Sequence, residues 1–124
     1  MPTSKTFVES FIKKYGKPPE NHAWIEYISL KIMAQAVIET KSTDTDKLIA
    51  YLEKQTEFDI LKGRKGYFRA WDHQLMQEAY PFTVRAKGEA KDQWDFIALG
   101  SAVPDPNEPL EILAPTKEQN PCSL

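Results

Sequence analysis

The sequence is poor in the side chains that most often build metal or thiol chemistry. Its 124 residues include one cysteine and two histidines, so no internal disulfide can form and no close H-x-x-H or C-x-x-C spacing exists for a closed zinc site. We therefore expect no metal and no other cofactor. A nucleophile pair of Cys122 with a histidine would stand beside a proline-rich end, where the preorganisation that catalysis needs is hard to achieve. We predict no catalytic residues and no enzyme activity.

Blocks of like charge and long apolar runs are also missing. Sixteen basic and eighteen acidic side chains leave a net charge of −2, with no basic stripe to release counterions from a phosphate backbone, so we expect no nucleic-acid partner. The longest apolar-rich stretch, 24–38, is interrupted by polar residues and is shorter than the about 20 residues that span a bilayer. The first residues lack an apolar signal-peptide segment, which predicts a cytoplasmic protein if Met1 is the true start.

Three helices are expected in the first half of the chain. Residues 3–15 carry an apolar stripe at helical spacing, and Gly16 followed by two prolines ends this helix. A second helix is expected at 20–40, with apolar residues around more than half of its circumference, so it should be buried on more than one side. Residues 42 and 43 are expected to cap a third helix that runs to residue 53.

After residue 55 the pattern changes to short aromatic and β-branched runs separated by glycine. These runs predict three or four short strands, at 58–61, 67–71, 80–86 and 94–99, which could form one sheet. Helices followed by strands predict an α+β fold for the isolated chain. Prolines crowd the end of the chain and predict a tail at 104–124 that is extended on the surface or loosely ordered: Pro104, Pro106, Pro109, Pro115 and Pro121.

Several short segments follow one another in a characteristic order. They are 7–19 (FVESFIKKYGKPP), 23–27 (AWIEY) with 34–36 (AQA), 41–44 (KSTD) before a leucine-rich helix, 66–69 (GYFR) leading into 71–74 (WDHQ), and Trp94-Asp95 with Val103-Pro104. In this order and spacing they resemble the last part of type I periplasmic binding proteins, above all the branched-chain (Leu/Ile/Val) amino-acid receptors of ABC transporters.

The resemblance implies part of an α/β fold with two lobes and the ligand in the cleft between them. Residues 1–103 would hold parts of both lobes and 104–124 the proline-rich tail. The first helix would finish the second lobe, residues 16–20 would cross between lobes, and the next two helices with the strand at Gly66 would belong to the first lobe. The last strands and the tail would return to the second lobe and the hinge.

The function that the resemblance implies is solute binding without catalysis. The chain would be the substrate-binding component of an ABC importer for branched-chain or related amino acids, or a truncated piece of one, acting in the periplasm and docking on the membrane permease. Two alternatives stay open. One is a stand-alone interaction module that forms a homodimer through exposed edges, and the other is an amino-acid-sensing receptor domain of the same fold.

The start of the second helix is the candidate ligand-binding site. In the family an aromatic side chain just before the tryptophan faces the cleft, and that position here is His22, with Asn21 and Trp24 beside it. A helix N-terminus presents free N–H groups and the positive end of the helix dipole. The alternatives are that His22 is an exposed first-turn residue and that Trp24, with Tyr27, anchors the core.

Two further motifs carry structural interpretations. Asp72 and His73 suggest acid–base chemistry or half of a metal site, but we expect them to secure a strand–loop junction through backbone hydrogen bonds. The basic segment 63–66 is bounded by glycines and lacks the spacing of a P-loop, so a solvated turn is the better interpretation.

Overall fold

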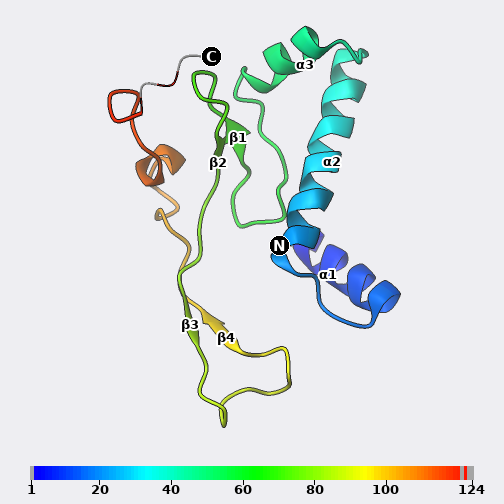
Figure 1. Ribbon diagram of the computed structural model, residues 1–124, viewed down its shortest axis with the longest axis vertical. Helices are drawn as coiled ribbons and strands as arrows, with labels where there is room; N and C mark the ends of the chain where they lie inside the picture. Colours follow the sequence, from blue (N-terminus) through cyan, green and yellow to red (C-terminus); the bar gives the residue numbers. More distant parts are fainter. Residues whose placement is uncertain (1, 121, 123–124) are drawn as a thin grey trace.

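The computed structural model describes residues 2–120 and 122, which form three helices followed by four short strands (Figure 1). This order confirms the predicted helices and the predicted partial fold. The elements are α1 (Pro2–Tyr15), α2 (Asn21–Thr40), α3 (Thr45–Leu52), β1 (Tyr67–Phe68), β2 (Leu75–Met76), β3 (Phe82–Val84), β4 (Ile97–Leu99) and a 3-10 helix, η1 (Leu110–Leu113).

The helix ends follow local chemistry. α1 stops where Gly16 takes a φ of 72° and donates its N–H to Ile12 O at 2.8 Å, a conformation that glycine adopts without steric cost. At α3 the prediction was wrong by one to two residues. The cap is Asp44, whose carboxylate accepts the N–H of Lys47 at 3.1 Å, while the Ser42 hydroxyl accepts the N–H of Asp44 at 3.1 Å and orders the turn before it.

The strands form two separate two-stranded antiparallel sheets, β1–β2 and β3–β4, and not one common sheet. The strand predicted at 58–61 is wrong, because only Phe58 pairs, in one isolated bridge with Gly66. Phe58 and Ile60 are instead fully buried in an irregular segment that packs on α2. β2 was missed, since a strand of two residues shows no alternation to recognise.

The core lies between α2 and this irregular segment. The buried residues of α2, Ile28, Ile32 and Ala36, form a single stripe, and the first two pack against Phe58 and Ile60. Other apolar side chains of α2 face solvent, with Leu30 70% exposed. Burial of α2 on more than one side is therefore not seen within the described residues.

The tail is fastened to the hairpin and is not loosely ordered from 104 to 120. Leu110 of η1 is buried, and the carbonyl of Glu108 accepts a hydrogen bond from Arg64 Nη1 at 2.9 Å. Further along, Pro115 O accepts one from Arg69 Nη1 at 3.0 Å. Residues 121, 123 and 124 of the predicted tail lie outside the described residues. In the part of the chain that the structure describes, no helix is long and apolar enough to cross a membrane.

Candidate ligand-binding site

The start of α2 places two of the three predicted site residues in solvent. Asn21 and His22 are exposed at the first two positions of the helix. Glu20 precedes them in an extended conformation without a side-chain cap, and its carboxylate instead binds Lys17 Nζ at 2.8 Å. This lysine holds the pKa of Glu20 below its usual value. The first-turn N–H groups of a helix have no acceptor within the helix, and the Glu20 side chain does not provide one here.

Trp24 lies one turn further along and faces the protein. Its indole Nε1 donates to Ile60 O at 2.8 Å, and its ring packs against the core cluster. The ammonium of Lys62 lies 4.9 Å from the centroid of the same ring. Trp24 thus anchors the irregular segment to α2, as the structural alternative for this residue expected, while Asn21 and His22 stand apart from it at the helix start.

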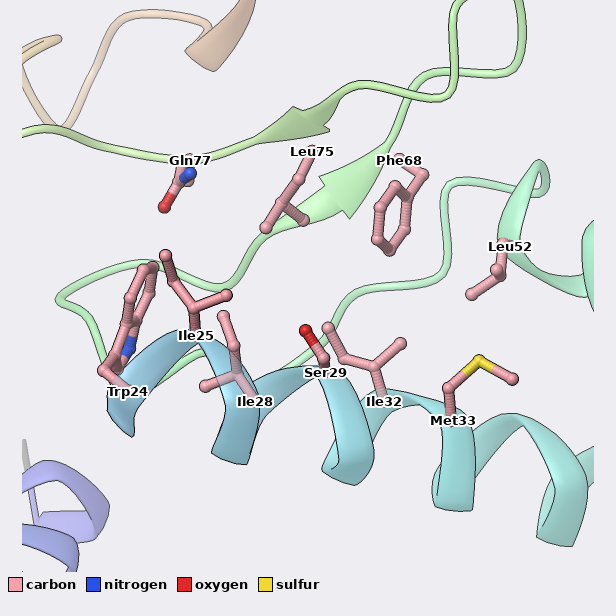
Figure 2. A pocket seen from close by; sticks show the side chains of 10 residues that line it. All are labelled: Trp24, Ile25, Ile28, Ser29, Ile32, Met33, Leu52, Phe68, Leu75 and Gln77. Atoms are coloured by element: carbon pink, nitrogen blue, oxygen red, sulfur yellow. The ribbon is translucent and has the colours of Figure 1, made fainter. Parts of the chain in front are cut away.

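An apolar groove of about 450 Å³ runs along α2 beneath the β1–β2 hairpin (Figure 2). Its floor is the side of α2 from Trp24 to Met33, and Phe68 and Leu75 of the hairpin form its roof. Gln77 closes one end, and its Oε1 is buried without a hydrogen-bond donor among the described residues. The groove matches the size of small-molecule sites, although it carries few polar groups to orient a ligand.

A polar cluster around Lys62 and Glu78 lies next to the Trp24 ring. Glu78 is buried, and its Oε1 accepts the N–H of Arg64 at 3.1 Å and also binds the Tyr80 hydroxyl. Lys62 Nζ donates to the backbone O of Glu78 at 2.7 Å. Burial lowers the pKa of Lys62, while the charge of Glu78 opposes this change. Burial and the bond to Glu78 raise the pKa of Tyr80.

The segment 63–66 is therefore more than a solvated turn. The N–H of Gly63 donates to Tyr80 Oη at 3.0 Å, beside the bond from Arg64 N to Glu78. A Cβ on Gly63 would lie 2.6 Å from Glu78 Oε1, so an alanine here would push the Glu78 carboxylate away from its hydrogen bonds to Arg64 N and Tyr80. Two successive backbone N–H groups of this turn therefore bind the Tyr80–Glu78 pair, one at the Tyr80 hydroxyl and the other at the buried carboxylate.

Asp72 and His73 secure the turn between β1 and β2, as expected. Asp72 Oδ1 accepts the N–H of Gln74 at 3.1 Å, and the N–H of His73 donates to Arg69 O at 2.9 Å. His73 Nε2 also lies 2.8 Å from Glu53 Oε1 at the end of α3. Arg69 completes this turn, because it is buried and pairs with Asp72 through two hydrogen bonds.

The residues that sequence reasoning missed are Arg69, Lys62, Gln77 and Glu78. Arg69 lies within the predicted strand at 67–71, whereas Lys62, Gln77 and Glu78 lie between the predicted strands, where the sequence gives no signal of their roles. Among the described residues, no group of three His, Cys, Asp or Glu side chains lies close enough together to hold a metal ion.

The helices and hairpins superpose on a solved structure. A periplasmic binding protein from Burkholderia mallei matches with a TM-score of 0.80 and 27% sequence identity, over 95% of this chain and 29% of that chain. The fold is therefore that of part of a periplasmic binding protein, as predicted. This chain spans less than a third of the length of the Burkholderia protein.

The family itself is shown by sequence. The pattern described as "Periplasmic binding protein" matches residues 1–89, well over half of the chain, and the chain belongs to the periplasmic binding protein family. The predicted resemblance is confirmed at this level. Specificity for branched-chain amino acids and the division of the chain between two lobes stay predictions. No curated protein matches the chain.

Proposed function

We propose that the chain provides part of a non-catalytic solute-binding protein of the periplasm, which delivers branched-chain or related amino acids to the membrane permease of an ABC importer. Membership of the periplasmic binding protein family over residues 1–89 is the observation that carries this proposal. Ligand capture would follow hinge closure, in which binding shifts an equilibrium between open and closed forms.

The start of α2 supplies the chemistry for one end of an amino acid. Its free N–H groups and the positive end of the helix dipole favour a carboxylate. Asn21 adds an amide that can donate and accept, and the exposed His22 adds a planar ring that can flank an aliphatic side chain. Trp24, held by its bond to Ile60 O, keeps this first turn in a fixed orientation.

The rim of the site carries both charges. Glu20 and Lys17 form an ion pair directly before Asn21, so a zwitterionic ligand would meet a carboxylate and an ammonium as well as the helix N–H groups. Both side chains are exposed, and their pairing is screened by water and salt. We therefore assign them a supporting role in recognition and assign the ligand contact to Asn21 and His22.

Titration of the ¹³C,¹⁵N-labelled chain with leucine tests the proposal by NMR. The few contacts at the start of α2 support only millimolar affinity, about −4 kcal/mol, so isothermal titration with leucine, isoleucine, valine and polar amino acids should detect no submicromolar binding. The ring resonances of His22 and the side-chain amide of Asn21 should shift with added ligand, and His22→Ala should abolish the response at Asn21.

The other histidine provides the control. His73 lies at the β1–β2 turn and contacts Glu53, so its resonances should not respond to leucine, and His73→Ala should leave the response at Asn21 unchanged. Absence of any shift at Asn21 and His22 at millimolar leucine would contradict the assignment of ligand contact to the start of α2. Submicromolar binding would contradict the expectation of a weak site.

A further inference from the structure

The start of α2 lacks the local features that usually fix the first turn of a helix. Glu20 at the N-cap makes no side-chain cap hydrogen bond, and the first turn contains no acidic residue. Helix ends without such partners fray, because local opening there costs little free energy. The hydrogen bond that closes this turn runs from Trp24 N to Glu20 O at 3.2 Å. The order of the turn therefore depends on what holds Trp24.

The Trp24 side chain is held by two contacts with the irregular segment after α3. Its indole Nε1 donates to Ile60 O at 2.8 Å, and the ammonium of Lys62 lies 4.9 Å from the centroid of the ring. The segment is itself tied to α2, since Lys31 Nζ binds Asp59 Oδ2 at 3.0 Å. An ammonium over an aromatic ring is attracted to it, and more strongly where water is partly excluded.

Lys62 extends this contact to the segment that follows β2. Its Nζ donates to Glu78 O at 2.7 Å and lies 5.8 Å from the centroid of the Tyr80 ring. Glu78 is buried, and the Tyr80 hydroxyl binds both its carboxylate and the N–H of Gly63. Burial lowers the pKa of Lys62 and so disfavours its charged form. The ammonium thus joins the Trp24 ring to a fixed part of the fold, at a cost in desolvation.

We propose that Lys62 is a positioning residue for the ligand-binding start of α2: its ammonium links the Trp24 ring to residues 78–80, which keeps the first turn closed and holds Asn21 and His22 in place. This role rests on the proposed ligand contact at Asn21 and His22. Lys62 acts through Trp24 and does not touch the ligand. The contacts that carry this role lie inside the chain, so they do not depend on what packs against the exposed side chains of α2.

Hydrogen exchange measured by NMR without ligand tests the link. In Lys62→Met, the backbone and indole N–H groups of Trp24 should exchange at least about threefold faster, as expected for the loss of a partly desolvated cation–π contact. Lys62→Arg keeps the charge and can stack on the ring, so both rates should stay within about twofold of the wild type. Lys65→Met removes an exposed lysine paired with Glu57 and should change neither rate.

The amide of Ile32, a buried residue in the middle of α2, separates positioning from overall stability. Its exchange rate should be the same in Lys62→Met and the wild type. Equal acceleration at Ile32 and Trp24 would mean that Lys62 stabilises the whole fold and would overturn the positioning role. So would an unchanged rate at Trp24 in Lys62→Met, or a Lys62→Arg variant that exchanges as fast as Lys62→Met. Circular dichroism verifies that each variant is folded.

Leucine titration connects the link to the site. The apparent Kd reported by the side-chain amide of Asn21 should rise about threefold in Lys62→Met, because only molecules with a closed first turn bind. Lys62→Arg should restore it, and an unchanged Kd in Lys62→Met contradicts the role in ligand binding. If the wild type itself does not respond to leucine, the proposed function fails, while the exchange rates without ligand still decide whether Lys62 closes the turn.

A pH titration of the wild type tests the same contact without depending on Lys62→Met. Between about pH 8 and about pH 11, loss of the Lys62 proton should shift the ring ¹³C resonances of Trp24. The midpoint should lie below the ordinary lysine pKa of about 10.4, because burial lowers the pKa of Lys62. Glu78 and Tyr80 are the other titratable residues in contact with this ammonium. The step should persist in Tyr80→Phe and disappear in Lys62→Arg, and Trp24 resonances that do not move refute the proposal.

Discussion

Replacing Arg69 by methionine removes the charge that pairs with a buried aspartate in the β1–β2 turn. The Arg69 and Asp72 side chains are 7% and 4% exposed, and Arg69 also donates to Gln74 Oε1 at 3.0 Å and to Pro115 O at 3.0 Å. The variant leaves the carboxylate buried without its cation and releases one attachment of the tail. Loss of one partner of a buried pair costs about 3–5 kcal/mol, a large part of the about 5–15 kcal/mol that stabilises a typical domain.

Urea unfolding followed by circular dichroism measures this loss. Arg69→Met should lower the free energy of unfolding by about 3 kcal/mol with little change in m-value. The double variant with Asp72→Asn should regain about 1–2 kcal/mol, because it removes the unpaired charge and still accepts the Gln74 N–H. The exposed pair of Lys65 and Glu57, at 3.6 Å, is the control, and Lys65→Met should cost less than about 1 kcal/mol.

The same pair predicts a dependence on pH. The hydrogen bond from Arg69 lowers the pKa of Asp72, with burial opposing it. Because the folded-state pKa lies below the ordinary value of about 3.9, the stabilisation is complete above that value and is lost as pH falls through the folded-state pKa. As the pH falls through this range, Arg69→Met should lose less unfolding free energy than the wild type. The reasoning is refuted if Arg69→Met costs less than about 1 kcal/mol, or if the double variant is no more stable than the single one.

Gly63→Ala should destabilise the chain by about 1–3 kcal/mol in urea, because its Cβ would lie 2.6 Å from the buried carboxylate of Glu78. Gly88→Ala, with no atom within 4 Å of the added Cβ, should change stability by less than about 1 kcal/mol, and equal losses in both variants would contradict the contact as the cause. Burial, together with its bond to Glu111, raises the pKa of Tyr67 to about 12. The stabilisation that neutral Tyr67 provides is therefore complete below the ordinary tyrosine pKa of about 10. It is lost as the pH rises toward the folded-state pKa of about 12. Absorbance titration should show one tyrosine that ionises only near pH 12 and is absent in Tyr67→Phe, whereas titration of all tyrosines near pH 10 would disprove the shift.

The helices could be predicted from sequence because their signals are local. Each signal lies within a few turns of the chain: the apolar stripe at 3–15, Gly16 with the following prolines, and the apolar run at 20–40. The observed bounds of α1 and α2 agree with these signals. The order of motifs was likewise enough to identify the family. The strands were harder to predict from sequence. Strands of two or three residues depend on the partner strand and on packing more than on intrinsic preference.

The candidate site divides in the same way. The sequence by itself determined that Asn21 and His22 open α2 and that Trp24 follows one turn later. Only the tertiary structure decided that Trp24 faces Ile60, that Arg69 and Asp72 are buried together, and that Gln77 closes an apolar groove. These features join residues far apart in the chain or depend on which aromatic runs are buried. Phe58 is buried and Phe82 exposed although their local sequences are alike in character, because burial depends on what the rest of the fold places against each residue.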